Sequence, residues 1–188
     1  MLDRRKTVKR LLADRGDALI IAGLGSPTYD VAAAGDDERN FYLWGAMGGA
    51  AMMGLGLALA RPERRVLVVT GDGEMLMGLG ALATIAVKRP PNLAVVVIDN
   101  GAFGETGMQP SHTAQGANLA AIARGCGIAA SFEVEDEAAL GQLAVTLRER
   151  RETIFANVRV AATDHPRVLP LKDGVALKQR FRRALGIA

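Results

Sequence analysis

The sequence places an aspartate between two glycines, Gly71-Asp72-Gly73, directly after a β-branched run that ends at Thr70. If a strand turns into a helix here, the first backbone N–H groups of that helix can bind an anion such as a diphosphate. The Asp72 carboxylate would repel a diphosphate unless a hard cation lay between them, and Mg²⁺ is usually held by one or two protein oxygens together with phosphates. The alternative is an unliganded turn in which Asp72 only caps the helix.

Asn100 offers a second oxygen at a suitable distance along the chain. Positions 74 to 99 separate it from Gly73, and these 26 residues are enough for one helix, a short turn and the next strand. Because neighbouring parallel strands end at the same edge of a sheet, we expect Asp72 and Asn100 to meet there. A carboxylate and an amide oxygen would then be available to one metal ion.

Apolar strands alternate with helices along the chain, which predicts an α/β protein with three layers, a central parallel sheet between two layers of helices. We expect strands at 18–22, 41–43, 66–70, 93–99, 131–134 and 153–160. We expect helices at 3–16, 47–60, 75–88, 118–124 and 137–150, and a basic helix at about 175–185. No repeat or linker interrupts this pattern, so residues 1–188 are expected to form a single domain.

The segment 100–117 is longer than most loops in compact domains and begins where a strand is expected to end. We therefore expect a binding loop rather than a plain surface excursion. It contains His112, one of only two histidines, which could stabilise an anionic substrate or transfer a proton as a catalytic group. The alternative is a solvated loop histidine, and nothing in the sequence assigns a task to Glu105 or Thr106.

Composition excludes several other classes of function. The 23 basic and 20 acidic residues leave a charge of +3, and one Trp, two Tyr and five Phe offer no stacking platform for nucleic acid. The single cysteine, Cys126, excludes an internal disulfide and fits a cytoplasmic protein, as does a charged N-terminus without an export signal. Residues 41–60 carry no charge, but half of them are Gly or Ala, so we expect no membrane span.

Gly-Asp-Gly followed by Asn after an interval in the twenties resembles the fingerprint of thiamin diphosphate enzymes. The resemblance implies that the side chains of Asp72 and Asn100 hold Mg²⁺, with the main-chain oxygen of Ala102 as the third protein ligand. The residues that it implies for the whole cofactor site are Ser26, Met47, Gly71, Asp72, Gly73, Glu74, Asn100, Ala102 and Phe103.

Two further segments carry this resemblance. Residues 45–60 look like the family's helix before Gly-Asp-Gly, which implies that Met47 wedges between the two rings of the cofactor. Ser26 matches a turn that contacts diphosphate oxygens; the same turn has Thr28 in place of the third glycine of a dinucleotide fingerprint, so a nicotinamide site is not expected. The chain departs from the family at Glu74, commonly Ser or Ala, because an acid there adds repulsion to a diphosphate unless a cation compensates.

The wider pattern is most similar to the β subunits of sulfopyruvate decarboxylase and the corresponding part of phosphonopyruvate decarboxylase. This implies non-oxidative decarboxylation of an acidic 2-oxoacid to an aldehyde. It also implies a hetero-oligomer, in which a separate pyrimidine-binding subunit supplies the glutamate that activates thiamin diphosphate.

Three alternatives stay open. The enamine that decarboxylation would create could instead react as in a carboligase like acetolactate synthase. A subunit of a 2-oxoacid:acceptor oxidoreductase would normally need iron–sulfur wiring, which one cysteine does not provide. Finally, the chain could be a non-catalytic module that binds the cofactor without turnover, a reading that Glu74 favours.

Overall fold

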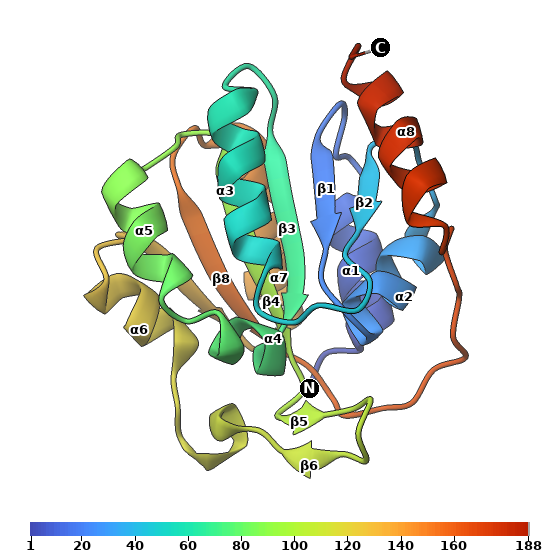
Figure 1. Cartoon of the computed structure of the whole chain (residues 1–188). Coiled ribbons are helices and arrows are strands. Elements are labelled where there is room, and N and C mark those ends of the chain that lie inside the picture. Colours follow the sequence, from blue (N-terminus) through green and yellow to red (C-terminus); the bar gives the residue numbers. More distant parts are fainter. Residues whose placement is uncertain (188) are drawn as a thin grey trace.

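The computed structural model describes residues 1–187 and is built around a sheet of six parallel strands (Figure 1). The strand order is β2-β1-β3-β4-β8-β7. The bounds are β1 Leu19–Ala22, β2 Asn40–Tyr42, β3 Val66–Gly71, β4 Leu93–Asp99, β7 Ala130–Val134 and β8 Ile154–Arg159. The predicted parallel sheet is therefore confirmed, with β3 and β4 side by side at its centre.

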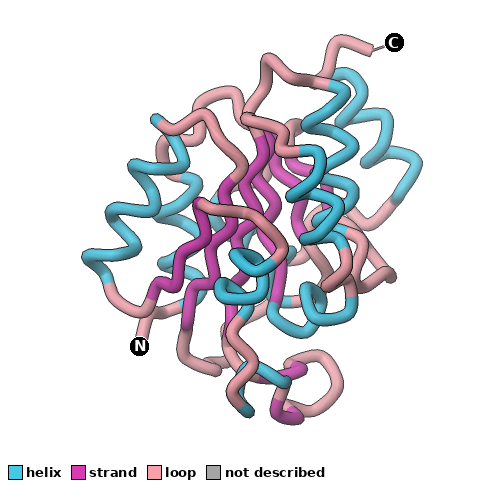
Figure 2. Tube along the Cα trace, turned by 90° about the vertical axis from the view of Figure 1, so that its left-hand side faces the viewer, coloured by secondary structure: helices cyan, strands magenta, loops and turns pink. Residues whose placement is uncertain are grey.

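Two layers of helices enclose this sheet, as the view in Figure 2 also shows. Successive residues of a strand point to opposite faces, so Val95 and Val97 of β4 join one apolar core while Val96 and Ile98 join the other. Helices α1 (Arg4–Leu12), α2 (Ser26–Ala34) and α7 (Glu137–Glu149) pack on one face. Helices α3 (Ala50–Ala60), α5 (Ala81–Lys88) and α6 (Leu119–Gly125) pack on the other, and α8 (Gly174–Ala184) lies along edge strand β2. The predicted three-layer αβα architecture is confirmed.

The helix predicted at 75–88 is in fact two helices, α4 (Asp72–Met77) and α5, joined by a turn at residues 78–80. The turn lies against the segment before α3: a methyl group added at Gly78 would lie 2.3 Å from the carbonyl oxygen of Gly48. Gly48 itself has a left-handed φ of +85°, which glycine adopts readily and which ends any regular helix. For this reason α3 begins at Ala50 and not at residue 47 as predicted.

Helix α2 was not predicted, although Pro27 stands in its first turn, a favoured position for proline. The long segment after β4 contains a small antiparallel hairpin, β5 (Ala102–Phe103) with β6 (Gln109–Pro110), and then the 3₁₀ helix η1 (His112–Gln115). Figures 1 and 2 show this segment beyond the carboxyl ends of the strands. The expected loop is thus an ordered structure at the edge of the sheet where ligands of parallel sheets bind.

The small residues of α3 allow the helix to approach the sheet closely. A methyl group added at Gly54 would lie 2.2 Å from Cγ2 of Val68, so any larger residue would push the helix away from β3. Within residues 1–187, no helix is long and apolar enough to span a bilayer. Close packing of helix on strand therefore accounts for the glycine at position 54.

Asp37 lies in the segment between α2 and β2 and contacts two arginines, Arg39 and Arg15. It accepts from Nε and Nη2 of Arg39 at 2.8 and 2.7 Å, and Arg15 lies 3.1 Å away. The Arg39 guanidinium, and then Arg15, hold the pKa of Asp37 far below its usual value, against some desolvation. The ionised carboxylate therefore stabilises the fold above its unfolded pKa of about 3.9, and this contribution is lost as the pH falls through the lower folded value.

Asp37→Asn is expected to lower the melting temperature at pH 7 by a few degrees at most, because solvent screens these partly exposed ion pairs. The difference from wild type should shrink as the pH is lowered below about 4. Thermal unfolding followed by circular dichroism between pH 3 and 8 measures this, with exposed Asp164→Asn as the control. A difference that stays constant over this range would contradict the assignment.

Candidate functional site

The register of β3 and β4 brings Asp72 and Asn100 to one edge of the sheet. Gly71 pairs with Ile98, so Asp72 directly follows one strand while Asn100 follows the end of its neighbour. Both residues line the same cavity. As expected, the residues between them leave the sheet at the end of β3 and return through β4, which ends at the same edge.

This cavity also collects every other residue expected for a cofactor site. Its lining is Arg4, Leu24, Gly25, Ser26, Pro27, Met47, Gly71, Asp72, Gly73, Glu74, Ile98, Asn100, Ala102, Phe103, Gly104, Glu105 and Thr106. The segments come from the β1–α2 turn, the stretch before α3, the start of α4 and the loop after β4. Their contribution to binding stays a prediction, but they surround one space.

Asp72 is a buried acidic group of this cavity, with 2% of its surface exposed. Its Oδ2 accepts hydrogen bonds from the hydroxyls of Ser111 and, at 3.3 Å, Thr113. Burial raises the pKa of Asp72 and the nearby charge of Asp99 adds to that rise, while the Ser111 hydroxyl opposes it. A desolvated carboxylate held in one orientation is a suitable ligand for a hard cation.

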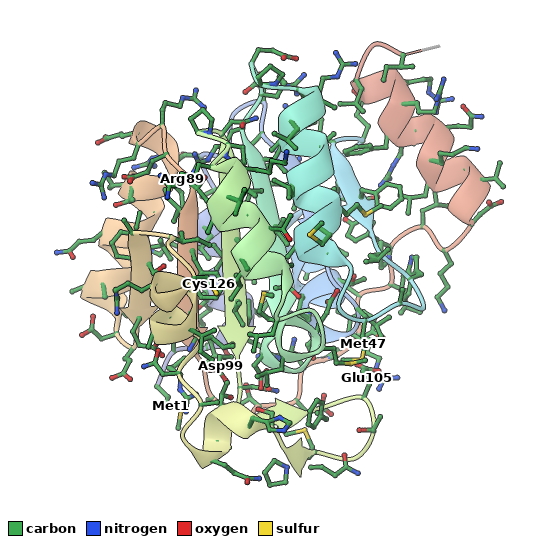
Figure 3. The ribbon with its side chains drawn as sticks, turned by 60° about the vertical axis from the view of Figure 1, so that its left-hand side comes forward. Met1, Met47, Arg89, Asp99, Glu105 and Cys126 are labelled. Atoms are coloured by element: carbon green, nitrogen blue, oxygen red, sulfur yellow. The ribbon has the colours of Figure 1, made fainter. Side chains whose placement is uncertain are left out.

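Asp99 supports this arrangement from the end of β4 (Figure 3). Its Oδ1 accepts from the Thr113 hydroxyl at 2.7 Å, and its Oδ2 accepts from Asn157 at 2.9 Å and Arg159 at 2.7 Å. Thr113 has one proton, so the shorter bond to Asp99 fixes that hydroxyl and leaves Ser111 as the main donor to Asp72. Sequence reasoning missed Ser111, Thr113 and Asp99, although an acid that ends an apolar strand was a usable signal.

The loop after β4 is shaped by Asn100 itself. Oδ1 of Asn100 accepts from the backbone N–H of Ala102 at 3.0 Å, an Asx turn, and Gly101 between them has a φ of +70°. Two residues further on, the ring of Phe103 lies against Gly73, where an added methyl group would come within 2.6 Å of ring atom Cε1. Gly73 therefore lets the aromatic ring close over the start of α4.

Glu74 does not present its carboxylate to the cavity as a free charge. Its Oε2 accepts from the N–H of Leu24 at 2.9 Å and the hydroxyl of Thr70 at 2.9 Å, and Oε1 accepts from the N–H of Ala50 at 3.3 Å. Burial raises the pKa of Glu74, and these donors oppose that rise. The expected repulsion of a diphosphate is therefore moderated, since the negative charge is shared with three protein donors.

Glu74 thereby connects three segments that border the cavity: the β1–α2 turn, the end of β3 and the start of α3. Gly23 makes room for it, since a methyl group there would lie 1.9 Å from Oε2 of Glu74. The glycines of the β1–α2 turn were considered above as part of a dinucleotide fingerprint. In the structure, Gly23 instead accommodates a buried carboxylate.

Ser26 and Met47 lie on different walls of the cavity. Ser26 is the first residue of α2, whose N-cap is Gly25 with a φ of +76° and no capping side chain, so N–H groups in its first turn remain available. Met47 lies in the irregular segment before α3 and is 39% exposed. Both Met47 and Glu105 line the cavity, and Figure 3 shows these two side chains close together.

His112 is adjacent in sequence to two residues that hydrogen-bond to Asp72, but its own side chain is not part of this group. It is the first residue of η1, its side chain is exposed, and it does not line the cavity. The structure thus places it where a solvated histidine would be, and its flanking residues Ser111 and Thr113 contact the site instead. The catalytic role of His112 therefore stays a prediction.

The fold and this site define a class of protein, the diphosphate-binding domains of thiamin diphosphate enzymes. Residues 32–158 match the family model described as "Thiamine pyrophosphate enzyme, C-terminal TPP binding domain". This match spans more than half of the chain, and the chain belongs to this family. A solved structure described as that of "a putative thiamin diphosphate-dependent enzyme" from Mycobacterium smegmatis shares the fold, with a TM-score of 0.69 at 19% identity over 86% of this chain and 32% of that one.

Particular relatives are similar at the level of sequence. The β subunit of sulfopyruvate decarboxylase from Methanocaldococcus jannaschii is 44% identical over 122 residues, 64% of each chain. The sulfopyruvate decarboxylase of Methanosarcina acetivorans is 33% identical over 186 residues, 98% of this chain and 47% of the relative. The phosphonopyruvate decarboxylase of Streptomyces viridochromogenes is 42% identical over 125 residues, 66% of this chain and 31% of the relative. The matched regions thus span from about a third to two thirds of these relatives.

Proposed function

We propose that this chain is the diphosphate-binding subunit of a thiamin diphosphate- and Mg²⁺-dependent decarboxylase that converts an acidic 2-oxoacid to an aldehyde. The observation that carries the proposal is the meeting of Asp72 and Asn100 in one cavity at the ends of neighbouring strands. Relatives named sulfopyruvate and phosphonopyruvate decarboxylase support the type of reaction and the acidic substrate.

The residues present fit a diphosphate with its cation. Asp72 offers a buried carboxylate, Asn100 an amide group and Ala102 a main-chain oxygen, while the uncapped start of α2 offers N–H groups to phosphate oxygens. Within residues 1–187, no three His, Cys, Asp or Glu side chains gather as a metal site. An Mg²⁺ site in this cavity therefore depends on amide and main-chain oxygens, which hard cations accept.

When bound, thiamin diphosphate supplies the electron sink for loss of CO₂. The chain's own residues bind and orient it: Asp72, held by Ser111, keeps one ligand geometry, and Met47 offers a deformable apolar contact to a ring system. Phe103 closes over Gly73 and limits water at the start of α4. His112 does not line the cavity of the single chain, so its part in proton transfer stays a prediction.

A second subunit is part of this proposal, and the cavity supports it. Its volume of about 90 Å³ is well below the roughly 300–1,000 Å³ of most cofactor sites, so this chain encloses only part of one. The relative from Methanosarcina acetivorans is about twice the length of its matched region, which leaves room for a second half. We therefore assign the missing walls to a pyrimidine-binding subunit that brings the activating glutamate.

The outer face of α3 and α4 suits such a partner. Its exposed residues include Met52, Met53, Leu59 and Met77, and no charged residue occurs between positions 41 and 60. Apolar faces of this kind on soluble proteins usually mark contact sites. Met47 lies three residues before α3, is itself exposed and lines the cavity, so a subunit docked on α3 would also reach the cofactor.

Met53→Glu is expected to lower affinity for the co-expressed pyrimidine-binding subunit by at least about tenfold, because it places a charge in an apolar contact. The variant should keep the wild-type melting temperature, since Met53 is exposed in the single chain. Co-purification and analytical ultracentrifugation measure the association. Val175→Glu, at an exposed apolar residue of α8, is the control; equal association of both variants would place the contact elsewhere.

Calorimetric titration with thiamin diphosphate and Mg²⁺, with and without the partner subunit, tests the proposed function. Binding that is absent even with the partner would refute it. Release of CO₂ from a panel of 2-oxoacids by the reconstituted pair then identifies the substrate. Product analysis separates an aldehyde from the longer acid that a carboligase would form, and cofactor binding without any turnover would favour a non-catalytic module.

A further inference from the structure

The cavity that contains Asp72 and Asn100 has a cation in its wall, Arg4 of α1, which is 4% exposed. Nη1 of Arg4 donates to Oδ2 of Asp30 at 2.5 Å, and Nε donates to the main-chain oxygen of Thr163 at 3.3 Å. Its third nitrogen, Nη2, makes no hydrogen bond within residues 1–187, and it is not among the fully buried nitrogens. Because Arg4 lines the cavity, this N–H donor is available to a ligand.

Arg4 and Arg5 share a single carboxylate, that of Asp30 in α2. Arg5 donates from Nε to Oδ1 of Asp30 at 3.1 Å, while Arg4 occupies Oδ2. The Asp30 side chain is completely buried, and no other carboxylate within residues 1–187 lies at ion-pair distance from either arginine. Two positive charges are thus matched by one negative charge, so the group stays positively charged.

Arg4 is the only Arg, Lys or His among the described residues that line this cavity. A neighbouring cavity of about 260 Å³ also has Arg4 and Ser26 in its lining, so these two residues lie where the two cavities meet. Ser26 is the first residue of α2, whose first turn has no capping side chain. A charged donor and neutral backbone donors therefore border the same part of the cavity.

We propose that Arg4 binds a phosphate group of the cofactor's diphosphate, an inference that rests on the proposed function above. A guanidinium forms short, charge-assisted hydrogen bonds to phosphate oxygens, and the start of a helix adds N–H donors and a favourable dipole. Arg4 and the start of α2 precede residues 32–158, the part of the chain that matches the family model. The contact is therefore an addition to those that the Gly-Asp-Gly and Asn fingerprint implies.

The charges around the cavity favour this contact. Three acidic residues line it, Asp72, Glu74 and Glu105, and a diphosphate brings further negative charge. Mg²⁺ would offset part of this charge, Glu74 is held by protein donors, and Glu105 lies 3.5 Å from Arg167, which is not in the cavity lining. A cation in the wall lowers the remaining repulsion, because charges interact more strongly in a partly desolvated site than in water. Arg4 thus supplies the compensating cation that an acid after Gly-Asp-Gly requires.

Calorimetric titration with thiamin diphosphate and Mg²⁺ in the presence of the partner subunit tests this contact. Arg4→Gln is expected to lower the affinity at least about tenfold, because it removes a charged donor to phosphate. Arg5→Gln is the matched control, since it removes the other arginine that pairs with Asp30 but does not line the cavity. Both variants should lower the melting temperature, whereas only Arg4→Gln should weaken binding by more than about threefold.

Inorganic diphosphate with Mg²⁺ shows which part of the cofactor Arg4 contacts. As a competitor of thiamin diphosphate, it should lose affinity for Arg4→Gln by the same factor as the cofactor does, because the lost contact is to phosphate. Unchanged affinity for diphosphate together with weaker binding of a 2-oxoacid would place the substrate's acidic group beside Arg4 and would overturn the proposal.

Arg4→Lys keeps the test informative if Arg4→Gln folds poorly. The lysine keeps a charge beside Asp30 but lacks the planar guanidinium, so the affinity should fall at least about threefold. A wild-type chain that binds no cofactor would refute the proposed function and this contact together. Cofactor binding at wild-type affinity by Arg4→Gln, or by Arg4→Lys where Arg4→Gln does not fold, would refute the role of Arg4 alone.

Discussion

Replacing Asp72 with alanine is expected to lower the affinity for thiamin diphosphate with Mg²⁺ by at least about 100-fold. The variant removes the buried carboxylate that directly follows β3, lines the cavity with Asn100 and is held in place by Ser111. Asn100 and the main-chain oxygen of Ala102 would then remain as neutral ligands, and neither offsets the cation's charge. Isothermal titration calorimetry with the partner subunit present measures the loss directly.

The same variant should not destabilise the chain in the absence of cofactor. Burial holds the pKa of Asp72 above its usual value, so the ionised group costs folding free energy at pH values above its folded pKa, and this cost disappears below the unfolded value. Alanine removes the cost, although it leaves the Ser111 hydroxyl without its acceptor. We expect a melting temperature at pH 7 that is unchanged or raised by about 2–4 °C.

Asp136→Ala is the matched control, because Asp136 is also an aspartate at a helix start but lies outside the cavity. Its side chain accepts from the N–H of Ala139 and caps α7. Loss of this cap should cost about 1 kcal/mol of stability while leaving cofactor affinity intact. Asp72→Ala is thus expected to lose cofactor affinity and keep its stability, whereas Asp136→Ala should lose stability and keep its cofactor affinity. Cofactor binding by Asp72→Ala at wild-type affinity would refute the proposed metal site.

The parts of the fold that were predicted from sequence depend on local patterns. The strands β3 and β4 are apolar throughout, and the number of residues between Gly73 and Asn100 permits only a short excursion before the chain returns to the same edge. The meeting of Asp72 and Asn100 follows from these two facts and from the geometry of parallel strands.

The parts that were missed depend on contacts between distant segments. The split between α4 and α5 follows from the approach of Gly78 to Gly48, and the hydroxyl that holds Asp72 comes from Ser111, 39 positions away. A serine or glycine has no pattern of its own that shows which segment it will face. His112 was selected for its chemistry, yet the loop turns it to solvent and turns its neighbours inward.

Glu74 shows most clearly how contacts between distant segments change what the sequence predicts for a residue. From the sequence it is an acid beside a diphosphate, which predicts repulsion. In the structure its carboxylate accepts from Leu24, Thr70 and Ala50, which lie on three separate segments. The departure from the family pattern at this position is therefore matched by a second feature elsewhere, the absence of a side chain at Gly23.

Gly23→Ala is accordingly expected to destabilise the chain by about 2–4 kcal/mol. The added methyl group would lie 1.9 Å from Oε2 of Glu74 and 2.8 Å from the Thr70 hydroxyl, so the carboxylate must move. Gly23 does not have a left-handed φ, so the cost comes from this contact and from the broken hydrogen bonds rather than from backbone strain. The melting temperature should fall by an amount on the order of 10 °C.

A double-mutant cycle with Glu74→Ala isolates this contact. Glu74→Ala alone leaves the N–H groups of Leu24 and Ala50 unpaired and should itself be destabilising. In that background the methyl group of Gly23→Ala enters the space of the missing carboxylate, so its further cost should fall below about 1 kcal/mol. If Gly23→Ala costs the same with and without Glu74, the two residues are not coupled. Coupling would show that the β1–α2 turn provides both the space and a donor for the acid that follows Gly-Asp-Gly.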